Sequence, residues 1–81
     1  MRLRLLAFAS ASDVLGAGES SLELAPGATV DDLKRTLLTR YPGLAALLPR
    51  LAVAVDGEIA SGDRELGDGA EVALLPPVSG G

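Results

Sequence analysis

The residues that point most specifically to a chemical reaction lie at the C-terminal end of the chain. A strand-like segment there leads into Pro76-Pro77-Val78-Ser79-Gly80-Gly81. The prolines favour an extended path. The two glycines lack Cβ atoms, so the tip is thin enough to enter a channel that any side chain would block. The α-carboxylate of Gly81 is the reactive group presented in this way. It can be activated by a nucleotide as an acyl adenylate and then attacked by a nucleophile from a partner.

The rest of the chain offers little catalytic chemistry. Its 81 residues include no Cys and no His, which excludes thiolate nucleophiles, metal sites built on thiolate or imidazole, and imidazole acid–base catalysis. Asp63, Glu65 and Asp68 lack the alternating ligand spacing of a Ca²⁺ loop. A net charge of −4 argues against nucleic acid or anionic lipid as a partner. We therefore expect no metal, no bound cofactor and no catalysis by the chain alone.

Two targeting signals are also missing from the sequence. No segment approaches the ~20 apolar residues of a membrane span. The apolar run at the start is too short for a secretory signal, because Ser10, Ser12 and Asp13 end it. These features predict a protein without a membrane partner and with a cytoplasmic location.

Hydrophobic periodicity predicts the elements that carry the tail. Alternation of apolar residues indicates strands, whereas apolar residues from Val30 to Tyr41 recur at helical spacing. Thr29 is a helix cap, and Asp32 can return its hydrogen bond. The expected strands are 3–9, 21–25, 51–55, 58–60 and 71–75; residues 10–21 form a loop with room for one helical turn at 12–15, and 44–48 add a short helical turn.

The order of these elements indicates the fold class. Two strands precede one main helix and further strands follow it, so the helix can cover only one face of a sheet of four to five strands. A right-handed crossover through the helix gives an α+β, ubiquitin-like β-grasp fold with a mixed sheet. A ferredoxin-like fold is the alternative, but it needs a second full helix. We expect one domain over residues 1–75 and a flexible tail over 76–81.

Strand alternation also predicts a docking surface on the face that the helix leaves uncovered. An Asp56-Gly57 turn pairs Ala54 with Ile59 and adds Ile59 to that face. The expected core positions are Leu3, Leu5, Val53, Val55, Val72 and Leu74, and the expected open-face positions are Leu6, Phe8, Ala52, Ala54, Ile59, Ala73 and Leu75. Exposed apolar patches usually mark interfaces. Phe8, Ile59 and Leu75 are the large members, so we expect partners to bind there. A second small core under the 10–21 loop is the alternative.

The C-terminal segment carries a specific resemblance. The run Leu66-Gly67-Asp68-Gly69-Ala70-Glu71-Val72-Ala73-Leu74-Leu75-Pro76-Pro77-Val78-Ser79-Gly80-Gly81 resembles the end of the small subunit of molybdopterin synthase, a ubiquitin-like sulfur carrier family. The strand with Phe8-Ala9, the helix start at Thr29-Val30 and the strand over 51–55 also lie where that family has them. Ala70 and Asp56 depart from its usual turn residues. Leu74-Leu75 replaces an aromatic pair, which bears on how tightly a partner binds.

The resemblance implies a mechanism and partners. An E1-like adenylating enzyme uses ATP to join AMP to the Gly81 carboxylate, and persulfide sulfur then replaces AMP to leave a thiocarboxylate. The tail, including Gly80 and the partner-binding residues Pro76, Pro77, Val78 and Ser79, inserts into the large synthase subunit in a heterotetramer. Sulfur moves there to a pyranopterin precursor.

Other functions remain open at this point. Related carriers serve thiamine, cysteine or tRNA thiolation, and a ubiquitin-like modifier would conjugate to lysines. A β-grasp interaction domain with an idle tail is the plainest alternative.

Overall fold

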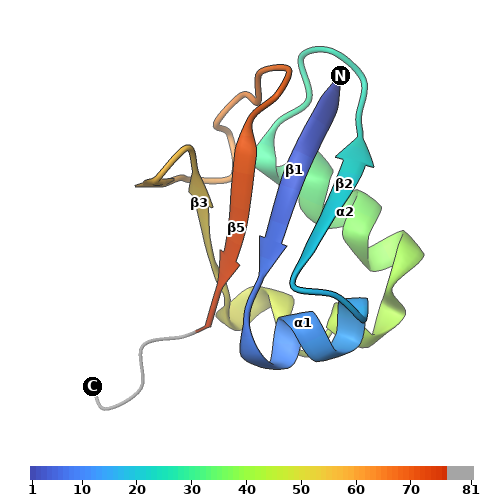
Figure 1. The fold of residues 1–81 in the computed structure, drawn as a ribbon. Coiled ribbons are helices and arrows are strands. Elements are labelled where there is room, and N and C mark those ends of the chain that lie inside the picture. The colour runs from blue at the N-terminus through green and yellow to red at the C-terminus, as the bar shows by residue number, and fades with distance from the viewer. Residues whose placement is uncertain (77–81) are drawn as a thin grey trace.

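Five strands form one mixed sheet in the order β2-β1-β5-β3-β4 (Figure 1). This computed structural model describes residues 1–76. The central strands β1 and β5 run parallel, and the other neighbours are antiparallel. The strands are β1 (Arg2–Ala7), β2 (Glu19–Glu23), β3 (Ala52–Val55), β4 (Glu58–Ile59) and β5 (Glu71–Leu75). The predicted β-grasp, ubiquitin-like fold with a mixed sheet is confirmed.

One main helix, α2 (Val30–Arg40), crosses one face of this sheet (Figure 1). Val30, Leu33 and Leu37 of the helix are fully buried against it. The sheet side of the core contains all six predicted residues, each at most 3 % exposed: Leu3, Leu5, Val53, Val55, Val72 and Leu74. Ala7 and Leu22 also belong to it. Strand alternation therefore identifies the covered face correctly.

The start of α2 is held by local and long-range hydrogen bonds. The Thr29 hydroxyl accepts from the Asp32 backbone N–H at 3.3 Å, and the Thr29 N–H donates to the Asp32 carboxylate at 2.9 Å, which confirms the predicted capping pair. The Val30 backbone N–H donates to the Arg64 carbonyl at 3.0 Å, and the Leu66 N–H donates to the Ala28 carbonyl at 2.9 Å. Leu66 is buried, as expected of a core anchor in that loop.

The prediction for residues 8–21 is wrong in two respects. Strand β1 ends at Ala7, and residues 9–15 form a second helix, α1 (Ala9–Leu15), in place of a loop with one turn. This helix has no side-chain cap and no acidic residue in its first turn, so its own sequence signals it weakly. Burial of Ala11 against the main core supplies the tertiary stabilisation.

The second strand is also displaced toward the N-terminus by two residues. It pairs along the whole of β1, from Arg2 opposite Glu23 to Leu6 opposite Glu19. This register lets Arg4 reach the Glu19 carboxylate at 2.6 Å. Cross-strand pairs of this kind help to select a register, and a single strand's own sequence does not contain them.

The remaining elements follow the prediction with small changes. Asp56 and Gly57 have φ of 49° and 87°, which is the pair of left-handed residues that a type I′ hairpin turn requires. Ala54 lies opposite Ile59 as predicted. Two short 3₁₀ turns, η1 (Pro42–Leu44) and η2 (Leu48–Arg50), replace the expected turn at 44–48. Within residues 1–76, no helix is long and apolar enough to cross a membrane.

Candidate functional site

The central strand of the sheet leads directly to the tail. Strand β5 is hydrogen-bonded to β1 on one side and to β3 on the other, and Leu75 is its last paired residue, opposite Ala52. Pro76 is exposed and has no N–H to continue the ladder. The tail therefore begins from a strand held on both sides. Pro77, Val78, Ser79, Gly80 and Gly81 lie outside the described residues, so what we expect of them stays a prediction.

The open face of the sheet carries a continuous apolar area beside this point. One cross-strand row runs from Leu6 through Ala73 and Ala54 to Ile59, and a second contains Leu75 and Ala52. Phe8 follows β1 and is 47 % exposed, while Ile59 is 69 % exposed. Leu6, Ala73 and Leu75 are half-buried, and none of these residues packs in the core cluster. The pairing places Leu6, Ala52, Ala54, Ile59, Ala73 and Leu75 on the open face, in agreement with the alternation. Phe8 lies outside the strand, and the role of all these residues in binding stays a prediction.

Two details of the docking-surface prediction need correction. Ala54 lies in the open-face row but is only 7 % exposed, because its short side chain lies between Ala73 and Ile59 on the neighbouring strands. The alternative of a second small core under residues 10–21 is also wrong. Those residues include α1, which lies at the end of the sheet (Figure 1), and Ala11 of this helix packs in the main core.

The other half of the open face carries arginines and glutamates that form ion pairs with one another. Arg2 pairs with Glu23 at 3.3 Å, and Arg4 pairs with Glu19 at 2.6 Å and Glu71 at 3.8 Å. The Arg4 guanidinium donates hydrogen bonds to the Glu19 carboxylate, and these bonds raise its pKa further above the ordinary value. The face is therefore polar at the start of β1 and apolar at its end, where the tail begins.

The acidic residues that sequence analysis considered as ligands make structural contacts. Asp68 accepts from the Arg2 backbone N–H at 2.8 Å, and Asp63 accepts from the Ser61 hydroxyl at 2.6 Å. The Thr29 backbone N–H, with Arg35 and the Thr29 hydroxyl, lowers the pKa of Asp32 below its ordinary value. Across residues 1–76 no group of three or more acidic side chains is placed to hold a metal ion. Asp63 and Asp68 therefore hold the loops that flank the sheet.

A hollow that no sequence pattern predicts lies at the base of the tail. The walls of the hollow come from the start of α1, from η2, from the residues next to η2 and from Pro76. Arg50 is the cation among its lining residues. The alternation of Leu51, Ala52 and Val53 signals the strand that follows, but no sequence pattern brings α1 and η2 together. Only the packed fold creates this feature.

A mixed five-stranded sheet crossed by one main helix, with a central strand that leads into the C-terminal segment, defines a ubiquitin-like β-grasp protein. The chain belongs to the ThiS family, whose model matches residues 5–81.

Its curated relatives span its full length. A molybdopterin synthase sulfur carrier subunit of Chlamydomonas reinhardtii is 36 % identical over 83 residues, covering 100 % of both chains. A protein of the same name from Caenorhabditis briggsae is 36 % identical over 81 residues, covering 98 % of this chain and 96 % of that protein.

Solved structures agree on the fold. SAMP1 of Haloferax volcanii, a small archaeal modifier protein, has a TM-score of 0.87 at 28 % identity and covers 100 % of both chains. A chain in the complex of subunits 1 and 2 of the molybdopterin-converting factor from Helicobacter pylori has a TM-score of 0.71 at 24 % identity, also covering 100 % of both chains. At that identity the second likeness concerns the fold.

Proposed function

We propose that this chain is the sulfur carrier subunit of a molybdopterin synthase. The observation that carries the proposal is the Gly-Gly terminus, which follows a central strand and an apolar open face in a chain whose full-length relatives bear that name. The absence of Cys and His from the sequence fits a protein whose sulfur is held on a backbone carboxyl group.

In the proposed cycle an E1-like enzyme joins AMP from ATP to the Gly81 carboxylate and releases pyrophosphate. The terminal sulfur of a protein persulfide attacks the acyl carbon and displaces AMP, which leaves an acyl disulfide. A thiol then attacks the S–S bond, forms a disulfide with the donor sulfur and releases the carrier as a thiocarboxylate. The large synthase subunit then receives the tail and supplies the acids and cations for sulfur transfer to a pyranopterin precursor. Because the carrier is acidic overall, we expect Arg and Lys of that subunit to surround the tail and hold its terminal anion.

The open face explains how one small surface serves both reactions. Leu75 adjoins the tail base, Phe8 lines the same hollow as Pro76, and Ile59 extends the open-face row that contains Ala73 and Ala54. Any protein that takes in the tail must approach this end of the sheet. The adenylating enzyme and the large subunit should therefore compete for the same patch.

The decisive experiment follows the mass of the intact chain. Incubation with ATP, the adenylating enzyme and a persulfide donor should add about 16 Da, the difference between oxygen and sulfur. Deleting Gly81 should abolish this gain without changing the melting temperature, since the described core cluster lies within residues 3–74. Thiocarboxylate formation on the shortened chain, or loss of folding, would contradict the proposal.

The likeness to SAMP1 supports a second candidate, a ubiquitin-like protein modifier. In that case the activated Gly81 carbonyl is attacked by a lysine ε-amine and an isopeptide bond forms. The two functions differ in the product: a free thiocarboxylate that donates sulfur, or a covalent conjugate visible as a higher-mass band that resists denaturation and reduction.

A further inference from the structure

A hollow of about 150 Å³ lies at the base of the tail, where its lining includes Pro76. Its apolar walls are Phe8, Ala11, Leu47, Leu51 and Pro76. Phe8 therefore belongs both to this hollow and to the open apolar area, so the two form one continuous surface. The last described residue, Pro76, forms part of the wall. A protein that holds the tail must approach this hollow.

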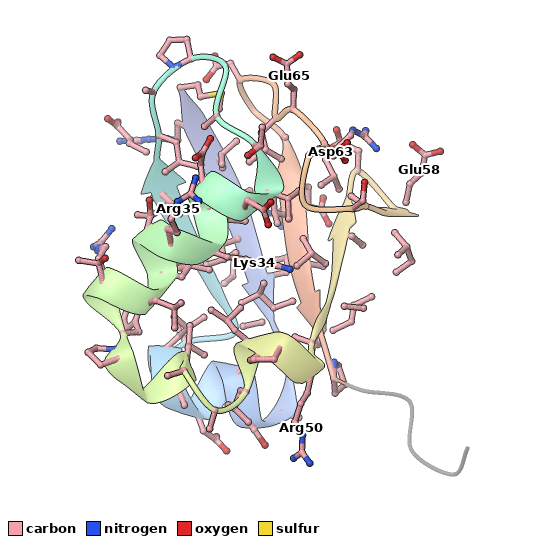
Figure 2. All side chains as sticks on the ribbon, turned by 180° about the vertical axis from the view of Figure 1, so that it is seen from behind. Lys34, Arg35, Arg50, Glu58, Asp63 and Glu65 are labelled. Atoms are coloured by element: carbon pink, nitrogen blue, oxygen red, sulfur yellow. The ribbon has the colours of Figure 1, made fainter. Side chains whose placement is uncertain are left out.

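Among residues 1–76, Arg50 at the end of η2 is the single charged residue that lines the hollow. Figure 2 shows it at the end of the domain where β5 finishes, whereas Glu58, Asp63 and Glu65 lie toward the opposite end. Within the part of the chain that the structure describes, Arg50 has no carboxylate partner. By contrast Arg2, Arg4, Arg35 and Arg64 each pair with one, and Arg40 lies over the Tyr41 ring.

These features indicate which groups of a partner would fit the hollow. The apolar walls fit one uncharged side chain, and the exposed guanidinium at the edge fits a carboxylate in a bidentate arrangement. On the open face, by contrast, Arg2 and Arg4 are engaged with glutamates of the same chain. Arg50 is thus the cation left to recognise an acidic group at this end of the domain.

We propose that the hollow and Arg50 form a second docking subsite, which accepts an apolar side chain next to an Asp or Glu of the large synthase subunit. The inference rests on the function proposed above. The open face supplies apolar contact area, and the Arg50 pair fixes the rotation of the carrier about its tail. This subsite would orient the tail as it enters the partner, and complementary charges of this kind contribute chiefly to specificity and register.

The test compares two charge reversals in the full chain. Arg50→Glu should weaken binding to the purified large subunit about tenfold, as expected for an interface anchor. Arg40→Glu is the matched control, because it makes the same change of net charge at an exposed position on α2. Equal affinities for the two variants, measured by titration calorimetry at one ionic strength, would overturn the proposal.

A second variant tests the hollow itself. Ser10 is an exposed residue of α1 on its lining, so Ser10→Phe should fill it from the edge. We expect about a tenfold loss of affinity with an unchanged melting temperature. Wild-type affinity in a folded Ser10→Phe chain would show that nothing enters the hollow.

The two proposals fail in different ways. If both variants gain the thiocarboxylate mass and bind the large subunit as tightly as the wild type, the subsite is wrong and the sulfur-carrier function stands. If the wild-type chain itself gains no mass, both proposals fall.

Discussion

Leu74 and Leu75 are adjacent in β5 but lie on opposite faces of the sheet, and this makes them a matched pair for testing the docking face. Leu74 is fully buried under α2, whereas Leu75 is half-buried on the open face opposite Ala52. Both are leucines in a strand that is hydrogen-bonded on both sides. Substitutions at the two positions therefore differ mainly in the surface that they alter: the core for Leu74 and the open face for Leu75.

We expect Leu75→Glu to weaken binding to each tail-accepting partner by about 1–2 kcal/mol, or roughly five- to thirtyfold. The loss arises because an apolar contact is replaced by a carboxylate that must be desolvated in the interface. The stability of the free domain should fall by less than ~1 kcal/mol, since the new carboxylate can reach water from the open face.

The control Leu74→Ala should show the opposite behaviour. Truncating a fully buried leucine costs about 2–5 kcal/mol, against a total of about 4–12 kcal/mol expected for a domain of 81 residues. At about 4–8 °C per kcal/mol, the melting temperature should drop by roughly 10 °C or more. The affinity per folded molecule should remain near that of the wild type.

The assay combines thermal unfolding with binding titrations against the adenylating enzyme and the large subunit. The reasoning is refuted if Leu75→Glu melts the domain while folded molecules bind normally. In that case Leu75 is a core residue, and the docking face is wrongly placed.

Further predictions concern the site and its supports. The loss of thiocarboxylate formation on deletion of Gly81 and the tenfold effect of Arg50→Glu are given above with their controls. Ala9 has a left-handed φ of 51°, so Ala9→Gly should stabilise the domain by about 0.5–1 kcal/mol in denaturant titrations, because relief of strain exceeds the added chain entropy; a destabilised variant would contradict this. The folded-state pKa of Asp32 is lowered from 3.8, so its contribution to stability is present above pH ~4 and is lost as pH falls through the folded value. The difference in unfolding free energy between the wild type and Asp32→Asn should therefore shrink below that pH; a difference independent of pH would count against it.

The sequence by itself determined the features that depend on neighbouring residues. Alternation in β1, β3 and β5 assigned Leu3, Val53 and Leu74 to the covered face, because successive strand residues point to opposite faces. Thr29 and Asp32 located the start of α2 through a hydrogen-bonding pattern that spans three residues. The Asp56-Gly57 turn set the pairing of Ala54 with Ile59.

The tertiary structure decided what depends on contacts between distant segments. Helix α1 has weak local signals and depends on the burial of Ala11 in the common core. The displaced β2 depends on its pairing with the whole of β1, including the ion pair of Arg4 with Glu19. The hollow with Arg50 exists only because α1, η2 and the end of β5 meet at one end of the domain. Neither helical periodicity nor strand alternation extends across such distances, so only the packed chain shows where the tail base has its additional recognition surface.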